Sequence, residues 1–190
     1  MSRTVDPARS VIPESTGPVG PESTRSAAPR AAGVLALLVR RGETVATAES
    51  LTAGLIGAEL TVPPGASAAF AGGVLAYATA LKHRLLGVPA ALLEREGAVH
   101  PEVAAAMADG VRELTGATYG VAATGVAGPD PQDGKPVGTV HLAVSGSGGR
   151  VWHRDLRLDG TREEIRRWTV NEAVDLLREV LESNSGEQSG

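Results

Sequence analysis

The stretch TVATAESLTAGLIGAEL, residues 44–60, decides the fold that we predict for this 190-residue chain. Its first part, TVATA, is a short run of small and β-branched residues that is typical of a buried strand, and LTAGLIGAEL returns to the apolar spacing of a helix. The Pro63-Pro64-Gly65 break ends that helix. We therefore predict a strand, a turn and a helix, with Glu49 and Ser50 at the turn.

The same alternation of strands and helices continues on both sides of this unit. Residues 138–145 and 151–158 predict an antiparallel hairpin, because a short Ser/Gly-rich link joins them. TREE at 161–164 has the spacing of a capping box and opens one long apolar-faced helix. Helices are also predicted at 31–40, 78–86, just after Pro89 and at 101–115, and strands at 72–77 and 118–124. This order predicts a three-layer α/β/α domain with a mixed sheet.

We expect that domain to occupy residues 31–183. Residues 1–30 are crowded with Pro, Ser, Thr and Gly and have no apolar period, so they predict a disordered tail, and residues 184–190 predict a flexible one. No segment has the apolar core of a secretory signal or the roughly 18 apolar residues of a membrane span. We therefore expect a cytoplasmic protein with no membrane partner.

The amino-acid composition limits which partners and which catalytic groups we expect. Hydrophobic residues make up 42% and charged residues 21%, as in globular proteins, and the net charge of -4 argues against a nucleic-acid partner. The chain has no cysteine, so covalent catalysis would have to use Ser, Thr or Lys. We expect no metal and no cofactor. Small α/β enzymes commonly form symmetric assemblies, which favours a homo-oligomer.

Ser50 has two interpretations. A serine between a strand and a helix most often caps the helix, its oxygen accepting a backbone N–H. The same place also offers free amides and a positive helix end to a developing oxyanion, which suits a nucleophile. A nucleophilic serine needs a base within hydrogen-bond reach, so position alone leaves both interpretations open.

Lysine is the more informative candidate base. The four histidines have no metal-ligand spacing, and any of them could be an ordinary surface or half-buried residue. Only Lys82 and Lys135 occur against sixteen arginines, and arginine cannot lose its proton. Lys82 follows Tyr77 by five residues, so the two converge more easily if Tyr77 ends a strand and Lys82 lies on the next helix. The alternative is a core-edge tyrosine and a solvated lysine.

Residues 125–138, GVAGPDPQDGKPVG, predict a loop. The spacing from Gly128 to Gly134 and the Pro136 that follows Lys135 exclude a Walker phosphate loop. A strand that ends at Thr124 and runs into this loop still offers backbone amides to a phosphate or carboxylate. A long connecting turn is the other interpretation.

Together these motifs resemble the CinA C-terminal domain family, whose enzymatic members are nicotinamide-nucleotide amidohydrolases. The motifs are TAESLTAG, GGVLAYATALKHRLLGV, GAVHPEV, TGVAGPD and KPVGTVHLAV, in this order, and the likeness covers about residues 33–181. The family often carries a further N-terminal domain that resembles molybdopterin-binding proteins, and this chain looks like the stand-alone form. His100 stands where family members often have serine.

The resemblance implies a serine amidohydrolase that uses neither histidine nor metal. Its catalytic serine, tyrosine and lysine fall on Ser50, Tyr77 and Lys82. It also points to Thr124 and to an arginine near the start of the last helix, for which Arg162 and Arg166 are both candidates. The expected substrate-binding residues are Glu49, Thr52, Thr124, Gly125, Gly128, Arg162 and Arg166.

The resemblance further implies that Ser50 attacks the carboxamide of nicotinamide mononucleotide while Lys82 takes its proton. Tyr77 would orient Lys82 or relay the proton, and amides at the start of the helix after Ser50 would hold the oxyanion, with Thr124. Glu49 should point away from Ser50 if the strand geometry continues. The alternatives are a nucleotide-binding module without turnover and an amidase for another amide.

Overall fold

The computed structural model describes residues 28–184. The tails predicted at 1–30 and 184–190 lie outside the described residues, apart from residues 28–30 and 184. Helix α1 (Ala28–Arg41) begins three residues before the expected domain boundary. Its Arg30 pairs with Asp175 of helix α6 (Arg162–Ser183) at 2.7 Å, which fixes the start of the helix against the last one.

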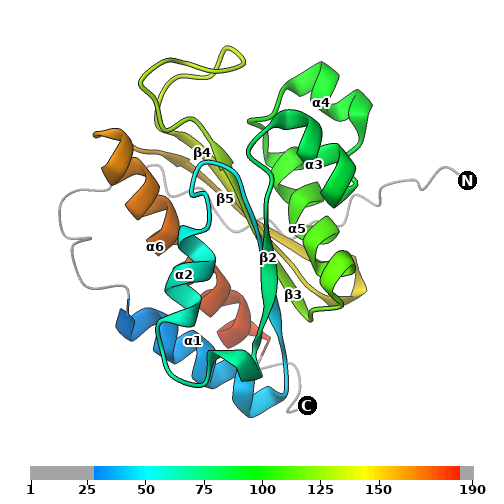
Figure 1. Ribbon diagram of the computed structural model, residues 1–190, viewed down its shortest axis with the longest axis vertical. Helices are drawn as coiled ribbons and strands as arrows, with labels where there is room; N and C mark the ends of the chain where they lie inside the picture. Colours follow the sequence, from blue (N-terminus) through cyan, green and yellow to red (C-terminus); the bar gives the residue numbers. More distant parts are fainter. Residues whose placement is uncertain (1–27, 185–190) are drawn as a thin grey trace, which may run out of the picture.

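A five-stranded mixed sheet forms the middle of the molecule, with strand order β2-β1-β3-β4-β5 (Figure 1). Strand β1 (Val45–Glu49) lies parallel to both β2 (Phe70–Leu75) and β3 (Tyr119–Gly125). The hairpin of β4 (Thr139–Ser145) and β5 (Val151–Arg157) continues the sheet in antiparallel register. The carboxyl ends of β1, β2 and β3 therefore meet at one edge of the sheet, where ligands bind in open α/β sheets.

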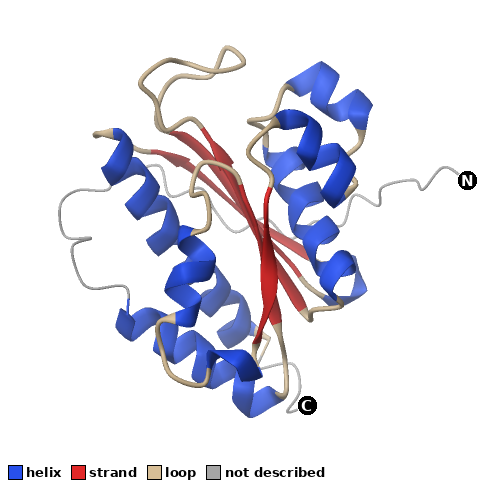
Figure 2. Ribbon diagram, in the orientation of Figure 1, coloured by secondary structure: helices blue, strands red, loops and turns tan. Residues whose placement is uncertain are grey.

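Helices cover both faces of the sheet, which confirms the predicted three-layer α/β/α architecture (Figure 2). Helices α1, α2 (Leu55–Thr61) and α6 pack on one face, and α3 (Thr79–Leu86), α4 (Ala90–Glu96) and α5 (Pro101–Thr115) lie on the other. Short 3-10 turns occur at Ala66–Ala68 and Ser147–Gly149. Each face encloses its own apolar core, so the central strands β1 and β3 are buried on both sides.

The helix ends follow the sequence signals. Gly87 and Gly116 follow α3 and α5 in left-handed conformation, as the predicted stop signals require. Thr161 and Glu164 form the predicted capping box at the start of α6. The strand and helix boundaries around the candidate site differ from the prediction, and both differences have a physical reason.

Helix α2 begins at Leu55 and not at Leu51. Residues 51–54 form a turn in which Ala53 and Gly54 have φ of 50° and 96°, and such left-handed residues cannot continue a right-handed helix. Strand β2 ends at Leu75, two residues before Tyr77, because its partner β1 ends at Glu49. The interpretation of Ser50 as a helix cap is therefore wrong, since Gly54 occupies the cap position.

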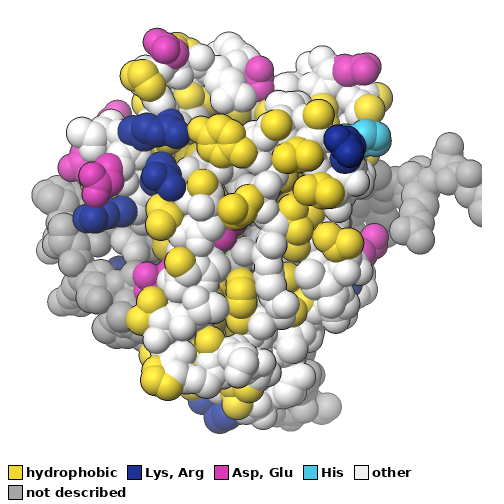
Figure 3. Space-filling view, viewed as in Figure 1, with side chains coloured by type: hydrophobic (Ala, Val, Ile, Leu, Met, Phe, Trp, Pro, Cys, Tyr) yellow, Lys and Arg dark blue, Asp and Glu magenta, His cyan; other side chains and the backbone are white. Residues whose placement is uncertain are grey.

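Apolar side chains gather on the face that carries the edge strand β2 (Figure 3). Leu75 is 53% exposed and Tyr77 is 60% exposed. Among the described helices, none combines the length and the apolar character that crossing a bilayer requires.

Candidate active site

Ser50 and Lys82 meet at the carboxyl edge of the sheet. Ser50 directly follows β1, and Lys82 lies on α3, 32 residues later. The Lys82 Nζ donates a 3.1 Å hydrogen bond to the Ser50 Oγ and a 2.8 Å bond to the Ala76 carbonyl. The lysine is 1% exposed, and it has the largest volume among the fully buried side chains described. The alternative of a solvated lysine is therefore wrong: the amine lies inside the protein beside a serine hydroxyl.

Burial changes the acidity of this amine. The loss of water around Lys82 lowers its pKa from 10.5 to about 8, although the negative charge of Asp133 opposes the shift. An amine with a pKa near 8 is neutral in part of the molecules at neutral pH and in most of them at pH 9. This pair thus has what a general base and a nucleophile require, namely contact and an available lone pair.

Glu49 points to the other side of β1, as the strand geometry predicted. Its buried carboxylate accepts hydrogen bonds of 2.8 to 3.1 Å from the N–H groups of Gly54, Ile56 and Gly57. These amides belong to the first turn of α2, where a negative charge also meets the positive end of the helix. The carboxylate therefore stabilises the turn that follows Ser50, Glu49 does not line the cavity beside Ser50, and its contact with substrate stays a prediction.

We predict that Glu49→Gln destabilises the protein by roughly 1–3 kcal/mol, because an amide NH₂ would face amide donors where the carboxylate now accepts. The urea midpoint at unchanged slope measures this change. Glu94→Gln, on the exposed side of α4, is the matched control and should shift stability by less than about 0.5 kcal/mol. Equal midpoints for the two variants would contradict the proposed support of α2 by Glu49.

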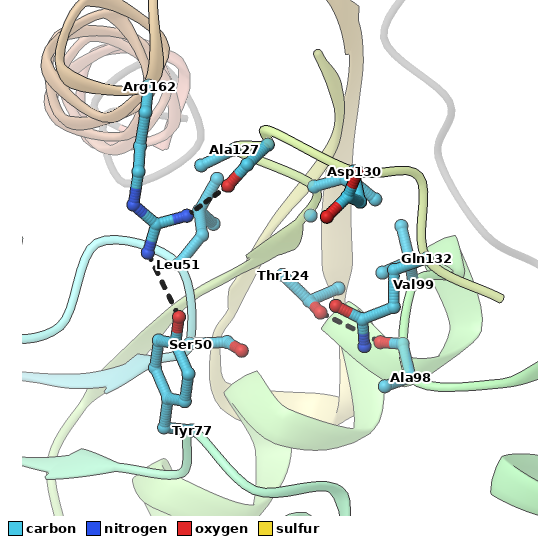
Figure 4. A pocket seen from close by; sticks show the side chains of 13 residues that line it. Ser50, Leu51, Tyr77, Ala98, Val99, Thr124, Ala127, Asp130, Gln132 and Arg162 are labelled. Carbon is cyan, nitrogen blue, oxygen red and sulfur yellow. Dashed lines mark hydrogen bonds between the residues drawn. The ribbon is translucent and has the colours of Figure 1, made fainter. Parts of the chain in front are cut away.

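A cavity of about 150 Å³ opens beside Ser50 (Figure 4). Thr124 forms part of its wall, and its Oγ1 donates a 2.7 Å hydrogen bond to the Ala98 carbonyl, so its one proton has a partner other than an oxyanion. The next residue of the wall, Gly125, has to be a glycine, because a Cβ at this position would lie 2.6 Å from the Thr139 carbonyl oxygen. The lining consists of Ser50, Leu51, Tyr77, Ala98, Val99, Thr124, Gly125, Val126, Ala127, Gly128, Asp130, Gln132 and Arg162.

Tyr77 and Arg162 close one side of this cavity. The Arg162 guanidinium donates to the Gly128 carbonyl at 2.6 Å and to the Tyr77 hydroxyl at 3.0 Å (Figure 4). Towards Lys82, Tyr77 offers its backbone carbonyl, 3.5 Å from the Lys82 Nζ, and the predicted role of its phenol in orienting Lys82 or relaying a proton stays a prediction. The phenol points to Arg162 because the chain has already left the strand at this residue.

The two candidate arginines of α6 lie in different surroundings. Arg162 lines the cavity, whereas Arg166 donates to the backbone carbonyls of Leu51 and Thr52 at 2.9 and 3.0 Å. The Thr52 side chain is fully buried and does not line the cavity. Arg166 on α6 therefore binds the turn that contains Thr52, neither residue lines the cavity, and a contact of either with substrate stays a prediction.

Sequence reasoning missed three acidic or amide residues of the glycine loop. Asp130 and Gln132 line the cavity, and Asp133 accepts a 2.8 Å hydrogen bond from the Ala98 N–H, which ties the loop to the segment before α5. Only their place in a Gly/Pro-rich loop after a buried strand pointed to them.

His100 caps α5, as a helix-entry residue would. Within residues 28–184, no cluster of three or more His, Asp or Glu side chains is arranged for a metal ion.

Comparisons with known proteins place this site in context. The family described as "CinA C-terminal domain" matches residues 27–181. A CinA-like protein of Frankia casuarinae is 55% identical over 148 residues, which cover 78% of this chain and 34% of that protein. The chain thus spans about a third of the length of this curated relative.

Solved structures agree with the fold. The competence/damage inducible protein CihA of Agrobacterium tumefaciens superposes with a TM-score of 0.79 at 37% identity, over 82% of this chain and 95% of that one. A CinA superfamily protein of Klebsiella pneumoniae superposes with a TM-score of 0.80 at 30% identity, over 84% of this chain and 99% of that one.

Proposed function

The chain belongs to the CinA C-terminal domain family, and we propose that it is an amidohydrolase that converts nicotinamide mononucleotide to nicotinate mononucleotide and ammonia. The reaction would serve the salvage of pyridine nucleotides. The observation that carries the proposal is the buried contact of 3.1 Å between the Lys82 amine and the Ser50 hydroxyl. If Lys82 were solvated and Ser50 only capped a helix, the amine and the hydroxyl would not be in contact.

In the proposed reaction, the neutral Lys82 amine takes the Ser50 proton while the Ser50 Oγ bonds to the carboxamide carbon. The C–N bond then breaks, Lys82 returns the proton to the leaving nitrogen, and ammonia departs. Water attacks the resulting ester while Lys82 takes a proton from the water; the bond from the acyl carbon to the Ser50 Oγ then breaks, and Lys82 gives that proton to the Oγ, which leaves the acid and the free serine. The Leu51 N–H follows Ser50 in the cavity wall and is our candidate oxyanion donor.

The size of the cavity suggests how the nucleotide lies. At about 150 Å³ it is smaller than the roughly 300–1,000 Å³ of typical ligand pockets. We propose that it holds the ring with its carboxamide, and that the ribose phosphate lies towards Arg162 and the glycine loop of Gly125 and Gly128. An arginine at the cavity mouth suits a phosphate, since it can donate two parallel hydrogen bonds.

The test is ammonia release from nicotinamide mononucleotide, its riboside and free nicotinamide. We expect the nucleotide to be the best substrate by about 10- to 100-fold in kcat/KM over the riboside, because the riboside lacks the charge that Arg162 would bind. A chelator should leave the rate unchanged. Nucleotide binding in calorimetry without ammonia would contradict the enzyme and favour a binding module.

The proposal includes a cytoplasmic location and a homo-oligomer, both of which stay predictions. The apolar face beside β2 is our candidate for the contact between copies, because an edge strand with exposed leucine invites pairing.

A further inference from the structure

Two polar side chains of the cavity wall have no task within the protein. Asp130 and Gln132 come from the glycine loop and lie across the cavity from Ser50 and Tyr77 (Figure 4). Among the described residues, neither side chain has a hydrogen-bond partner or an ion-pair partner. By contrast, the third long polar side chain of the wall, Arg162, already donates to two oxygens. Asp130 and Gln132 are therefore two polar groups of the wall that can bind an occupant without giving up a hydrogen bond within the protein.

The loop that carries them is held in place on both sides. The backbones of Gln132 and Lys135 exchange two hydrogen bonds of 2.8 and 3.1 Å, which close a small turn. Between them, Asp133 accepts from the Ala98 N–H. The other end of the loop is tied to α6 through the Gly128 carbonyl and Arg162. Asp130 and Gln132 thus face the cavity from an anchored segment.

We propose that Asp130 and Gln132 make this cavity select a neutral carboxamide over the carboxylate that replaces it. This inference rests on the proposed function. A carboxylate only accepts hydrogen bonds, so Asp130 suits the two N–H donors of a carboxamide and repels a product carboxylate. Gln132 both donates and accepts, so it pairs with either form without charge. The wall opposite Ser50 thereby favours substrate entry and acid release.

The experiment measures binding without turnover. In a Ser50→Ala background, calorimetry gives the dissociation constants of nicotinamide mononucleotide and nicotinate mononucleotide, and their ratio reports the selection. We expect Asp130→Asn to tighten the acid form by about 5- to 20-fold while changing the amide form by less than about 3-fold, since one nearby like charge is removed. Gln132→Glu should weaken the acid form further, because it adds a charge to the same wall.

Asp159→Asn is the matched control, since Asp159 is also an exposed aspartate and lies outside the cavity lining. An unchanged ratio in Asp130→Asn, or an equal change in Asp159→Asn, overturns the inference. Failure of either nucleotide to bind overturns it as well. Failure of the proposed function is seen separately, as the absence of ammonia from the wild-type protein, and a shifted binding ratio would then still support selection by this wall.

Discussion

Ser50→Ala protein is expected to release ammonia from nicotinamide mononucleotide at least about 1,000-fold more slowly than the wild type. The variant removes the only hydroxyl that contacts the Lys82 amine among the described residues. Without that oxygen no ester forms, and the remaining cavity only binds the nucleotide. A fixed-time ammonia assay with purified protein measures the loss.

Two control measurements separate the loss of the nucleophile from a loss of folding or a general effect of removing a serine. The Ser50→Ala variant should keep the wild-type circular dichroism spectrum, because the Ser50 backbone N–H still donates to the Ala123 carbonyl. Ser67→Ala, which removes an exposed serine hydroxyl on the turn before β2, should keep full activity. Turnover by the Ser50→Ala variant at a tenth of the wild-type rate or more would show that another group attacks.

Much of the fold was predictable, because its signals are local. Gly87, Gly116 and the capping box at Thr161 mark helix ends through backbone geometry that depends on few neighbours. The start of α2 was not predictable in this way. Its first amides bond to the carboxylate of Glu49, five to eight residues earlier, so the boundary depends on a side chain outside the helix pattern.

In the candidate site too, features with a local signal or a family motif were predictable, and features that depend on distant residues were not. The meeting of Ser50 and Lys82 was expected from the family resemblance, and the scarcity of lysine pointed to the same residue. The environment of Tyr77 was not predictable, because the direction of its ring depends on Arg162, 85 positions away. Spacing likewise could not separate Arg162 from Arg166, since both lie in the first turns of α6. Their difference arises from what each meets across the sheet edge, the Gly128 carbonyl or the turn after Ser50.

Lys82→Met is expected to abolish ammonia release and to remove a pH dependence that the wild type shows. With a pKa of about 8, the wild-type amine is neutral in about a tenth of the molecules at pH 7 and in most of them at pH 9. The wild-type kcat/KM should therefore rise about tenfold from pH 7 to pH 9 and then level off. A flat wild-type profile over this range would contradict a lysine base.

The same substitution should reveal the cost of burying this lysine. The pKa of Lys82 is about 8 in the folded protein and 10.5 in an exposed chain, so between these pH values the unfolded state binds more protons and wild-type stability rises with pH. Lys82→Met lacks this contribution, and its free energy of unfolding relative to wild type should fall by roughly 3 kcal/mol from pH 7 to pH 10.5. The broken bond to the Ala76 carbonyl adds an offset that does not vary with pH. Lys135→Met, which removes the second of the two lysines in the chain, is the matched control for the loss of a lysine charge. If the free energy of unfolding of Lys82→Met, measured with urea, runs parallel to that of wild type over this pH range, the Lys82 amine stays charged. The proposed proton transfer from Ser50 would then lose its acceptor.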